Sequence, residues 1–352
     1  MIDIRRKEDC VGCRGCVQAC PKDCISFDED AEGFRYPKVD LALCIQCGLC
    51  ERVCPVIHRY PPRLPEKVYA AKNSDSSVQS RSSSGGVFAA LAAEVISEGG
   101  VVFGARFDSR FEAVHDFAET FEGIERFIGS KYLQSRMGDC YSAARKFLKE
   151  GRRVMFSGTP CQTAGLARFL RKDYGSQLLK VDIACHAVPS PKVWRDYLSH
   201  IAGDNEVRSV SFRDKRDGWS DYGLCIDGGK AGGETRRLFF EPHSENLYMR
   251  GFLSDIFIRP SCFECPAKRG RSSADITLGD FWGLSRNYPL LYARGLYSLL
   301  LVNSETGMEA LKKAGIEMAE AEYKIAVSAN KGLETSPCRS RYTSRLWSLY
   351  KT

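Results

Sequence analysis

The sequence lacks any apolar run long enough to cross a bilayer. Its best candidate, residues 87–96, is short and rich in alanine, whereas a membrane-spanning helix needs about 20 predominantly apolar residues. Residues 1–9 also lack the apolar core of a secretory signal. We therefore expect a cytoplasmic protein without a membrane span, whose cysteines are kept as thiols.

The sequence also lacks a large excess of either positive or negative charge. The formal net charge is +7 over 352 residues, and the basic residues are scattered except for two groups at 213–216 and 268–271. No known RNA-binding or DNA-binding module surrounds either group, so we expect no nucleic-acid partner. A mild basic excess suits a phosphate-bearing cofactor or an acidic electron-transfer partner.

Cysteine, by contrast, is abundant, and much of it follows one pattern. The spacing CxxCxxCxxxCP occurs twice, at residues 10–21 and 44–55. It is typical of bacterial ferredoxins with two 4Fe-4S clusters, because three thiolates on one tight loop bind one cluster and the fourth cysteine reaches the other. The predicted ligands of the first cluster are Cys10, Cys13, Cys16 and Cys54, and those of the second are Cys20, Cys44, Cys47 and Cys50.

Zinc and disulfides account for these cysteines less well. A zinc site uses paired CxxC knuckles with four ligands per ion, which a CxxCxxC run followed by CP does not match. Disulfides would need an oxidising compartment. Cys24 lies outside the pattern, and we interpret it as a packed free thiol.

Four further cysteines lie in distinctive surroundings. Cys161 follows SGTP, Cys185 precedes His186, and Cys262 and Cys265 form a CxxC pair. A third 4Fe-4S cluster would need four such thiolates, but spacing alone does not show that they converge. The alternatives are a structural zinc with borrowed ligands such as His186, a redox nucleophile at Cys161 with a pKa lowered by a helix N-terminus, and simple packing.

The hydrophobic pattern after residue 67 alternates predicted strands with predicted helices, as in a parallel α/β unit. Strong helix patterns cover 87–98 and 137–151, and a strand–turn–helix–strand series spans 153–185. Helix-like segments at 308–319 and near residue 346 end the chain.

The predicted fold class is α+β or α/β, with an N-terminal two-cluster ferredoxin domain followed by a mixed α/β core that binds a flavin. The predicted parts are a ferredoxin domain at 1–60, a proline-rich linker at 61–67, two parts of the core at 68–150 and 151–310, the second with the third cluster, and a helical extension at 311–352.

Small residues fill the loop before the first core helix. Ser83, Ser84, Gly85 and Gly86 lead into that helix, where free backbone N–H groups and the helix dipole favour a phosphate or an electron-rich ring edge. The loop has neither the Gly-Lys-Ser/Thr ending of a P-loop nor the GxGxxG fingerprint. A serine run that caps a core helix explains the loop equally well.

Six segments together resemble the coenzyme F420 hydrogenase/dehydrogenase β-subunit family. They are SSSGGVFAALAAEVISEGGVVFGARF (82–107), SKYLQS (130–135), VMFSGTPCQTAGLARFL (154–170), IACH (183–186), SFRDKRDGW (211–219) and CFECPAKRGRSSADITLGDFWG (262–283). The resemblance implies a flavin, usually FAD, in the α/β core beside one 4Fe-4S cluster. Its implied cluster ligands are Cys161, Cys185, Cys262 and Cys265.

The segments that carry the resemblance also contain candidate residues for binding the flavin and the substrate. Besides the loop 83–86, the flavin candidates are Lys131, Gln134, Gly158, Thr159 and Gln162. The substrate candidates are Arg213 and Lys215, as cations for an acidic tail, and Trp219, as a stacking surface. A solvated basic turn with one packed tryptophan is the alternative for the last three.

The sequence thus predicts an iron–sulfur flavoprotein oxidoreductase. It would pass electrons between a two-electron substrate, either a deazaflavin such as coenzyme F420 or another conjugated molecule, and 4Fe-4S clusters that serve a ferredoxin or another redox protein. A flavin handles one or two electrons and a cluster handles one, which explains why one chain holds both. The alternatives are a ferredoxin-dependent reductase of a sugar or pigment precursor and a non-catalytic electron-transfer subunit.

Overall fold

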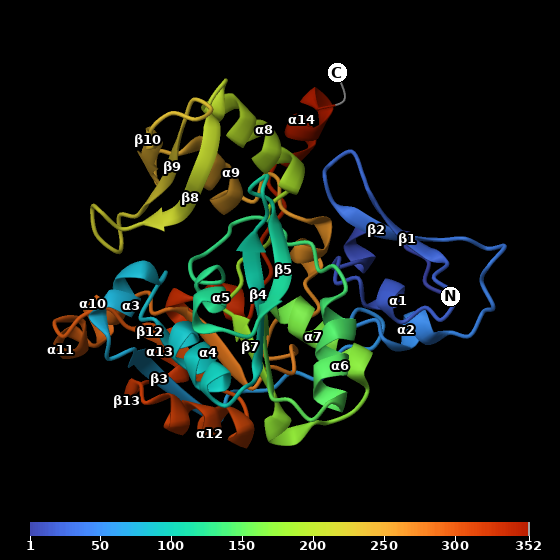
Figure 1. Cartoon of the computed structure of the whole chain (residues 1–352), viewed down its shortest axis with the longest axis horizontal. Coiled ribbons are helices and arrows are strands. Elements are labelled where there is room, and N and C mark those ends of the chain that lie inside the picture. Colours follow the sequence, from blue (N-terminus) through green and yellow to red (C-terminus); the bar gives the residue numbers. More distant parts are fainter. Residues whose placement is uncertain (351–352) are drawn as a thin grey trace.

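The computed structural model describes residues 1–350, which form a hairpin-containing N-terminal part, a large central sheet and a small third sheet (Figure 1). The predicted fold, a ferredoxin domain followed by a mixed α/β core, is confirmed. Within the described residues, no helix is both long enough and apolar enough to cross a membrane.

The N-terminal part is built around its two cysteine loops. The short helices α1 (Gly15–Gln18) and α2 (Leu49–Arg52) each begin inside a CxxCxxC run. Arg14 and Gly48, directly before them, have positive φ angles of 59° and 71°, which let the chain turn tightly between cysteines. The strands β1 (Ile25–Glu29) and β2 (Arg35–Val39) pair antiparallel between the two loops.

The central sheet has eight strands in the order β13-β3-β12-β11-β7-β6-β4-β5. The inner strands β11, β7, β6 and β4 run parallel, while antiparallel pairs complete both edges. The strand bounds are β3 (Lys67–Lys72), β4 (Val101–Phe107), β5 (Ala113–Ala118), β6 (Val154–Gly158), β7 (Leu178–Ile183), β11 (Ile276–Asp280), β12 (Ser298–Val302) and β13 (Glu317–Glu320).

Helices cover both faces of this sheet, which explains its continuous apolar strands. On one face, α4 (Val87–Ser97), α5 (Phe121–Glu125) and α12 (Glu305–Ala314) pack on residues such as Val102. On the other, α6 (Cys140–Lys149) and α7 (Pro160–Leu170) pack on residues such as Phe103. The two neighbours Val102 and Phe103 are fully buried on opposite faces, as strand alternation requires.

The third sheet is antiparallel, in the order β10-β9-β8, and packs on two helices (Figure 1). Its core is aromatic: the Trp194 ring lies 4.7 Å from the Phe212 ring and 5.2 Å from the Tyr248 ring. The elements are β8 (Glu206–Asp214), β9 (Gly223–Gly229), β10 (Arg236–Pro242), α8 (Pro191–Ala202), α9 (Leu247–Leu253) and α14 (Thr343–Leu349). The other short helices are α3 (Ser76–Arg81), α10 (Leu284–Asn287), α11 (Pro289–Tyr292) and α13 (Tyr323–Ala329).

Two sequence predictions about the C-terminal half need correction. The predicted helix at 308–319 ends at Ala314, because Gly315 takes a positive φ of 62° and residues 317–320 pair with β3 as an edge strand. The predicted helical extension therefore contains a strand, and its last residues, 351–352, lie outside the described residues. Helix α8 was not predicted, although Ser190 caps it and Pro191 opens it.

The segment predicted as a linker is bonded to the core. The Arg63 N–H donates to the Arg269 carbonyl (3.0 Å) and the Glu66 N–H to the Val302 carbonyl (2.8 Å). Lys67 already belongs to β3. Residues 61–67 therefore lie along the core and are hydrogen-bonded to it. The predicted domain boundaries themselves remain predictions.

Arg259 joins the N-terminal part to the core. Its guanidinium, 1% exposed, donates to the Cys10 carbonyl (2.8 Å), the Arg35 carbonyl (2.9 Å) and the Gln134 side-chain oxygen (2.8 Å). It also lies 4.5 Å from the centre of the Tyr36 ring. One side chain thus bonds both the first cysteine loop and the hairpin.

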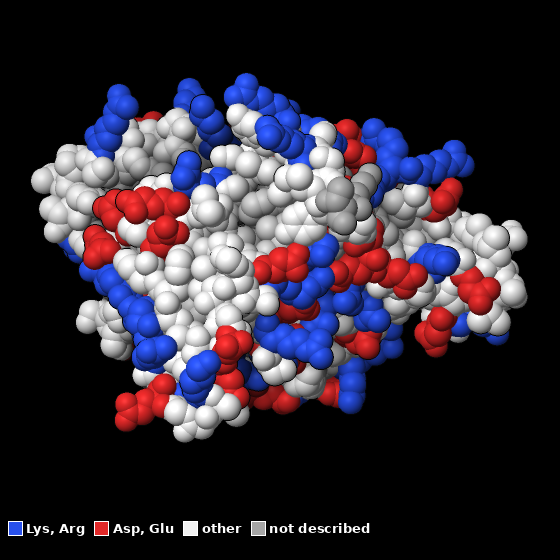
Figure 2. Space-filling model, turned by 90° about the horizontal axis from the view of Figure 1, so that it is seen from above, with Lys and Arg blue, Asp and Glu red and all other residues white. Residues whose placement is uncertain are grey.

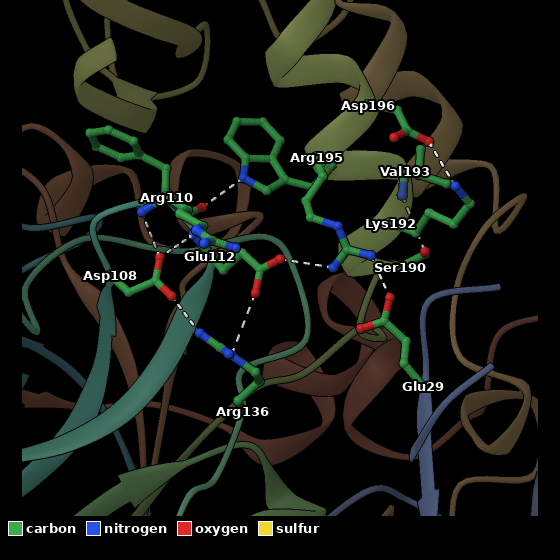
Figure 3. Close-up of polar contacts among 12 residues, drawn as sticks. Glu29, Asp108, Arg110, Glu112, Arg136, Ser190, Lys192, Val193, Arg195 and Asp196 are labelled. Carbon is green, nitrogen blue, oxygen red and sulfur yellow. Dashed lines mark hydrogen bonds and ion pairs between the residues drawn. The ribbon is translucent and has the colours of Figure 1, made fainter. Parts of the chain in front are cut away.

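A second junction is ionic (Figure 3). Arg195 on α8 donates to Glu29 on β1 and to Glu112 in the core, the latter at 2.8 Å. Arg136 in turn pairs with Glu112 and with Asp108. The chain of alternating charges ties the hairpin to the third sheet's helix and to the edge of the central sheet.

Replacing Arg259 tests its role as the joint. The Arg259→Met variant leaves three buried acceptors without their donor, so we expect the free energy of unfolding to fall by about 3 kcal/mol. Denaturant unfolding, followed through cluster absorbance under anaerobic conditions, measures this. Arg5→Met, at a side chain that is 87% exposed, is the control, and equal stability of the two variants would contradict the role.

Candidate functional site

The first cysteine set, Cys10, Cys13, Cys16 and Cys54, is gathered in one place. Burial, together with the nearby thiols of Cys54, Cys16 and Cys10, raises the pKa of Cys13 well above its usual range. Thiols that oppose each other's ionisation in this way are stabilised as thiolates when a metal cluster compensates their charge. The donor set therefore fits a 4Fe-4S cluster.

The second set, Cys20, Cys44, Cys47 and Cys50, lines one small cavity with the apolar side chains of Ile25 and Val39. Cys54 thus lies with the first set and Cys20 with the second, the arrangement that crossed ligation requires. Cys24 is buried, lines the same cavity, and has its sulfur 3.4 Å from that of Cys20. All sixteen cysteines lie among the described residues, and none of them is in a disulfide bond.

The third set converges at the carboxyl edge of the central sheet. Cys161 opens α7 directly after β6, and Cys185 follows the neighbouring parallel strand β7. Cys262 lies in a short 3-10 helix (Pro260–Glu264), and Cys265 directly follows it. Burial is the main cause of the raised pKa of Cys262, and the other three thiols each add to it. The four half-buried cysteines therefore lie near one another at this edge of the sheet, which their spacing alone did not reveal.

One of the alternatives for this set loses support. Burial raises the pKa of Cys161 to about 11, the opposite of the shift that a redox nucleophile needs. The His186 ring is hydrogen-bonded through Nε2 to the Asp255 carboxyl group (2.7 Å). A metal-binding histidine commonly holds a carboxylate in this way through its second nitrogen, so the zinc alternative stays open.

The serine–glycine loop is held by the sheet on one side. The Gly85 N–H donates to the Ser298 hydroxyl (2.9 Å), and a Cβ at Gly85 would lie 2.6 Å from the Ala71 carbonyl oxygen. Ser83 and Ser130 share a hydroxyl hydrogen bond (2.8 Å). Gly86 begins α4 with φ +80° and no side-chain cap, so the N-terminal donors of α4 have no capping side chain.

The predicted substrate residues lie against this loop. Trp219 donates its indole N–H to the Ser83 carbonyl (3.3 Å), and Lys215 donates to the Ser82 carbonyl (2.6 Å). The two predicted groups, far apart in sequence, therefore form one site, which we call the loop site. Trp282 also belongs to it, because its ring stacks on Trp219 with the ring centres 4.7 Å apart, and no local sequence pattern indicated this residue.

Arg213 is the charged centre of the loop site. It is 6% exposed and donates to Asp280 (2.6 Å), while its guanidinium lies 4.0 Å from the Tyr222 ring centre. Its Nε and Nη2 have no hydrogen-bond partner among the described residues. Buried donors without partners are uncommon in proteins, and at a candidate site they indicate a missing acceptor.

Two other flavin candidates are engaged by the protein itself. The Lys131 ammonium donates to the carbonyls of residues 126, 128 and 129 at 3.0–3.1 Å, and burial lowers its pKa to about 7. Gln134 accepts from Arg259 and donates to the Val11 carbonyl (3.2 Å). Gln134 thus belongs to the joint with the N-terminal part.

The remaining candidates belong to a hydrogen-bond network beside Cys161. Thr159 donates its N–H to the Gln162 side chain (2.8 Å), whose amide donates to Ser135 (2.9 Å). Ser135 donates to His115 Nδ1, because His115 Nε2 must donate to the Ser157 carbonyl (3.1 Å). Gly158 is adjacent, since a Cβ there would lie 3.0 Å from the Gln162 oxygen. The network fixes Gln162 and a neutral His115.

A cleft of about 370 Å³ lies between the hairpin and the core. His115, Ser135 and Gln134 form part of its core wall, and Glu29 and Arg35 part of its hairpin wall. Elsewhere the surface carries charges of both signs, which intermingle on the face shown in Figure 2.

The fold and the cysteine sets define the class, an iron–sulfur protein with an α/β core. The chain belongs to the coenzyme F420 hydrogenase/dehydrogenase β-subunit family. Residues 151–326, half of the chain, match the family model for the C terminus of the coenzyme F420 hydrogenase/dehydrogenase beta subunit, and residues 9–57 match a 4Fe-4S dicluster domain. The predicted family and the predicted ferredoxin domain are therefore confirmed.

Three known proteins are similar to parts of this chain. The F subunit of F(420)H(2) dehydrogenase from Methanosarcina mazei is 24% identical over 51% of this chain, a match that spans 54% of that protein. Ferredoxin 7Fe of Hydrogenibacillus schlegelii is 44% identical over 19% of this chain and 87% of its own length. A chain of the F420-reducing NiFe hydrogenase complex from Methanosarcina barkeri aligns over 78% of this chain and 90% of its own, with 16% identity and a TM-score of 0.47.

Iron content tests the third cysteine set. We expect Cys262→Ala to lose about a third of the iron, about four atoms of about twelve, while keeping the absorbance of the two ferredoxin clusters. Cys225→Ala is the matched control, because Cys225 is also buried but lies on β9 outside the three sets. Iron retained in full by Cys262→Ala would sink the assignment.

The pH dependence of stability tests the network at His115. Burial lowers its pKa to about 4, whereas an unfolded histidine has a pKa of about 6.5. Below about pH 6.5 this histidine is therefore protonated in the unfolded chain but stays neutral in the folded chain. As a consequence, the free energy of unfolding should fall by about 1.5 kcal/mol as the pH is lowered from about 6.5 to about 5. His115→Gln should show a flatter dependence in anaerobic denaturant unfolding, and identical slopes would contradict the buried neutral ring.

Proposed function

We propose that this protein is an iron–sulfur flavoprotein oxidoreductase. It takes up or delivers two electrons at a small conjugated substrate, for which a deazaflavin of the coenzyme F420 type is the first candidate, and exchanges single electrons with a redox protein. The observation that carries the proposal is the loop site. There a buried arginine with two unpaired donors lies 5.9 Å from the ring centre of Trp219, and Trp219 is bonded to the loop before the uncapped start of α4. Three cysteine sets in the same chain supply the one-electron side.

The loop site suits a large anionic aromatic ligand. Arg213, held by Asp280, keeps its positive charge in a buried place and offers Nε and Nη2 to an acceptor. The N–H groups at the start of α4 attract the same kind of negative group. The Trp219–Trp282 pair supplies a flat apolar wall on which a conjugated ring can stack.

The third cysteine set lies close to this site by topology. Asp280 ends β11 and Cys185 follows β7, and these two strands are parallel neighbours that share a carboxyl edge. Ligands of open α/β sheets bind at this edge. Bound there, a flavin would exchange hydride with the substrate and single electrons with a cluster.

The residues of this chain then have separate tasks. Arg213 and the α4 start bind the anionic groups, the two tryptophans orient the ring, and Lys215 fixes the loop by holding the carbonyls of Gln79 and Ser82. The N-terminal part serves as the connection to a ferredoxin or another redox protein. The names of the F420-linked relatives support the deazaflavin as the first substrate to try.

The cofactor content and the substrate are tested by one preparation. Protein purified anaerobically should hold about twelve irons and one flavin per chain, and reduced deazaflavin, but not NADH, should bleach the flavin. About eight irons without flavin would favour an electron-transfer subunit instead. Bleaching of the flavin by NADH and not by reduced deazaflavin would exclude the deazaflavin as the substrate.

Arg213 is tested by removing its charge. We expect Arg213→Met to raise the KM for reduced deazaflavin, or to lower flavin occupancy, by at least about tenfold, because a charged hydrogen bond contributes roughly 1.5–3 kcal/mol. Arg208→Met is the control, since Arg208 lies on the same strand and bonds Thr235 and nearby carbonyls. Equal binding by the two variants would remove Arg213 from the site.

A further inference from the structure

The two cysteine sets of the N-terminal part relate differently to the core. The first set is pressed against α7: a Cβ placed at Gly165 would lie 3.0 Å from the Cys13 Cβ and 3.2 Å from its sulfur. Val11 and Cys13 are buried in the same apolar cluster as α6 and α7. The cavity of the second set, by contrast, is lined only by residues 1–50.

Gly165 also relates the first set to the third. It lies four residues after Cys161 on α7, so both positions are on one side of the helix, one turn apart. A side chain larger than hydrogen at this position would separate the Cys13 loop from α7. Glycine is costly inside a helix, by about 1 kcal/mol relative to alanine, and close approach is a reason to keep it there.

Tyr141 on α6 fills the remaining space between the two sets. Its ring is fully buried, its hydroxyl donates to the Gln162 carbonyl (2.7 Å), and the same hydroxyl would lie 2.7 Å from a Cβ at Gly165. A Cβ at Gly15 of α1 would lie 3.7 Å from its ring.

We propose that Tyr141 and Gly165 are positioning residues that hold the first cysteine set against the third, so that the first set lies between the other two and the second set is terminal. The proposal rests on the proposed function in one respect, because it takes the third set to hold a cluster. The exposure of the second set agrees with a terminal position. Cys47 is exposed, and Leu43 and Ile45 beside it are each 57% exposed.

Magnetic coupling between reduced clusters tests the pairing. In Cys47→Ala, which removes the second cluster, the iron content should fall to about eight atoms. The electron paramagnetic resonance spectrum of this variant, reduced anaerobically, should show splitting or broadening from two interacting clusters. A spectrum equal to the sum of two isolated clusters at that iron content would overturn the proposal. An iron content of about four would instead show that the third cluster, and with it the proposed function, is wrong.

The positioning residues are tested in the same Cys47→Ala background. We expect Gly165→Leu to weaken the coupling at unchanged iron content, while Ala167→Leu, at a half-buried position of the same helix, leaves it intact. Gly165→Ala is the milder second variant, and adding Tyr141→Phe, which removes the oxygen 2.7 Å from the new Cβ, should restore part of the coupling. Unchanged coupling in both Gly165 variants, or no rescue by Tyr141→Phe, would overturn the positioning role.

Discussion

The contact between Arg259 and the backbone of the N-terminal part is the constraint on which the arrangement of sites depends. Arg259 directly precedes the segment that carries Cys262 and Cys265, and it bonds Cys10 and Arg35 on the other side of the joint. One buried guanidinium thus ties the third cysteine set to the first. Since a buried charge is costly without partners, its three acceptors and the ring of Tyr36 keep this joint in a single geometry.

The central sheet explains why residues scattered over the sequence meet. Cys161 follows β6, Cys185 follows β7 and Asp280 ends β11, and these strands are consecutive and parallel in the sheet. Their carboxyl ends therefore present a cysteine pair and the partner of Arg213 along one edge. The third sheet then brings Arg213 and Trp219 over that edge, against the loop before α4.

The features that could be predicted from the sequence are those that depend on residues close together in the chain. The cysteine runs, the family, the helices α4 and α6 and the series β6–α7–β7 follow from patterns of a few residues. The convergence of the third set and the joint at Arg259 depend on contacts between residues far apart in the chain, which no local pattern encodes. Strand β13 was missed for the same reason, because its pairing with β3 overrides a helical pattern.

The cavity of the second cysteine set has a consequence for how such a chain can change. Its wall is made only of residues from the N-terminal part, while the joint to the core uses Cys10, Val11, Cys13 and Arg35. The outward loop near Ile45 can therefore vary in shape and charge without disturbing the core or the loop site. Substitutions confined to this one loop can therefore adapt such a chain to a new redox partner. The residues that bind the substrate are not changed by them.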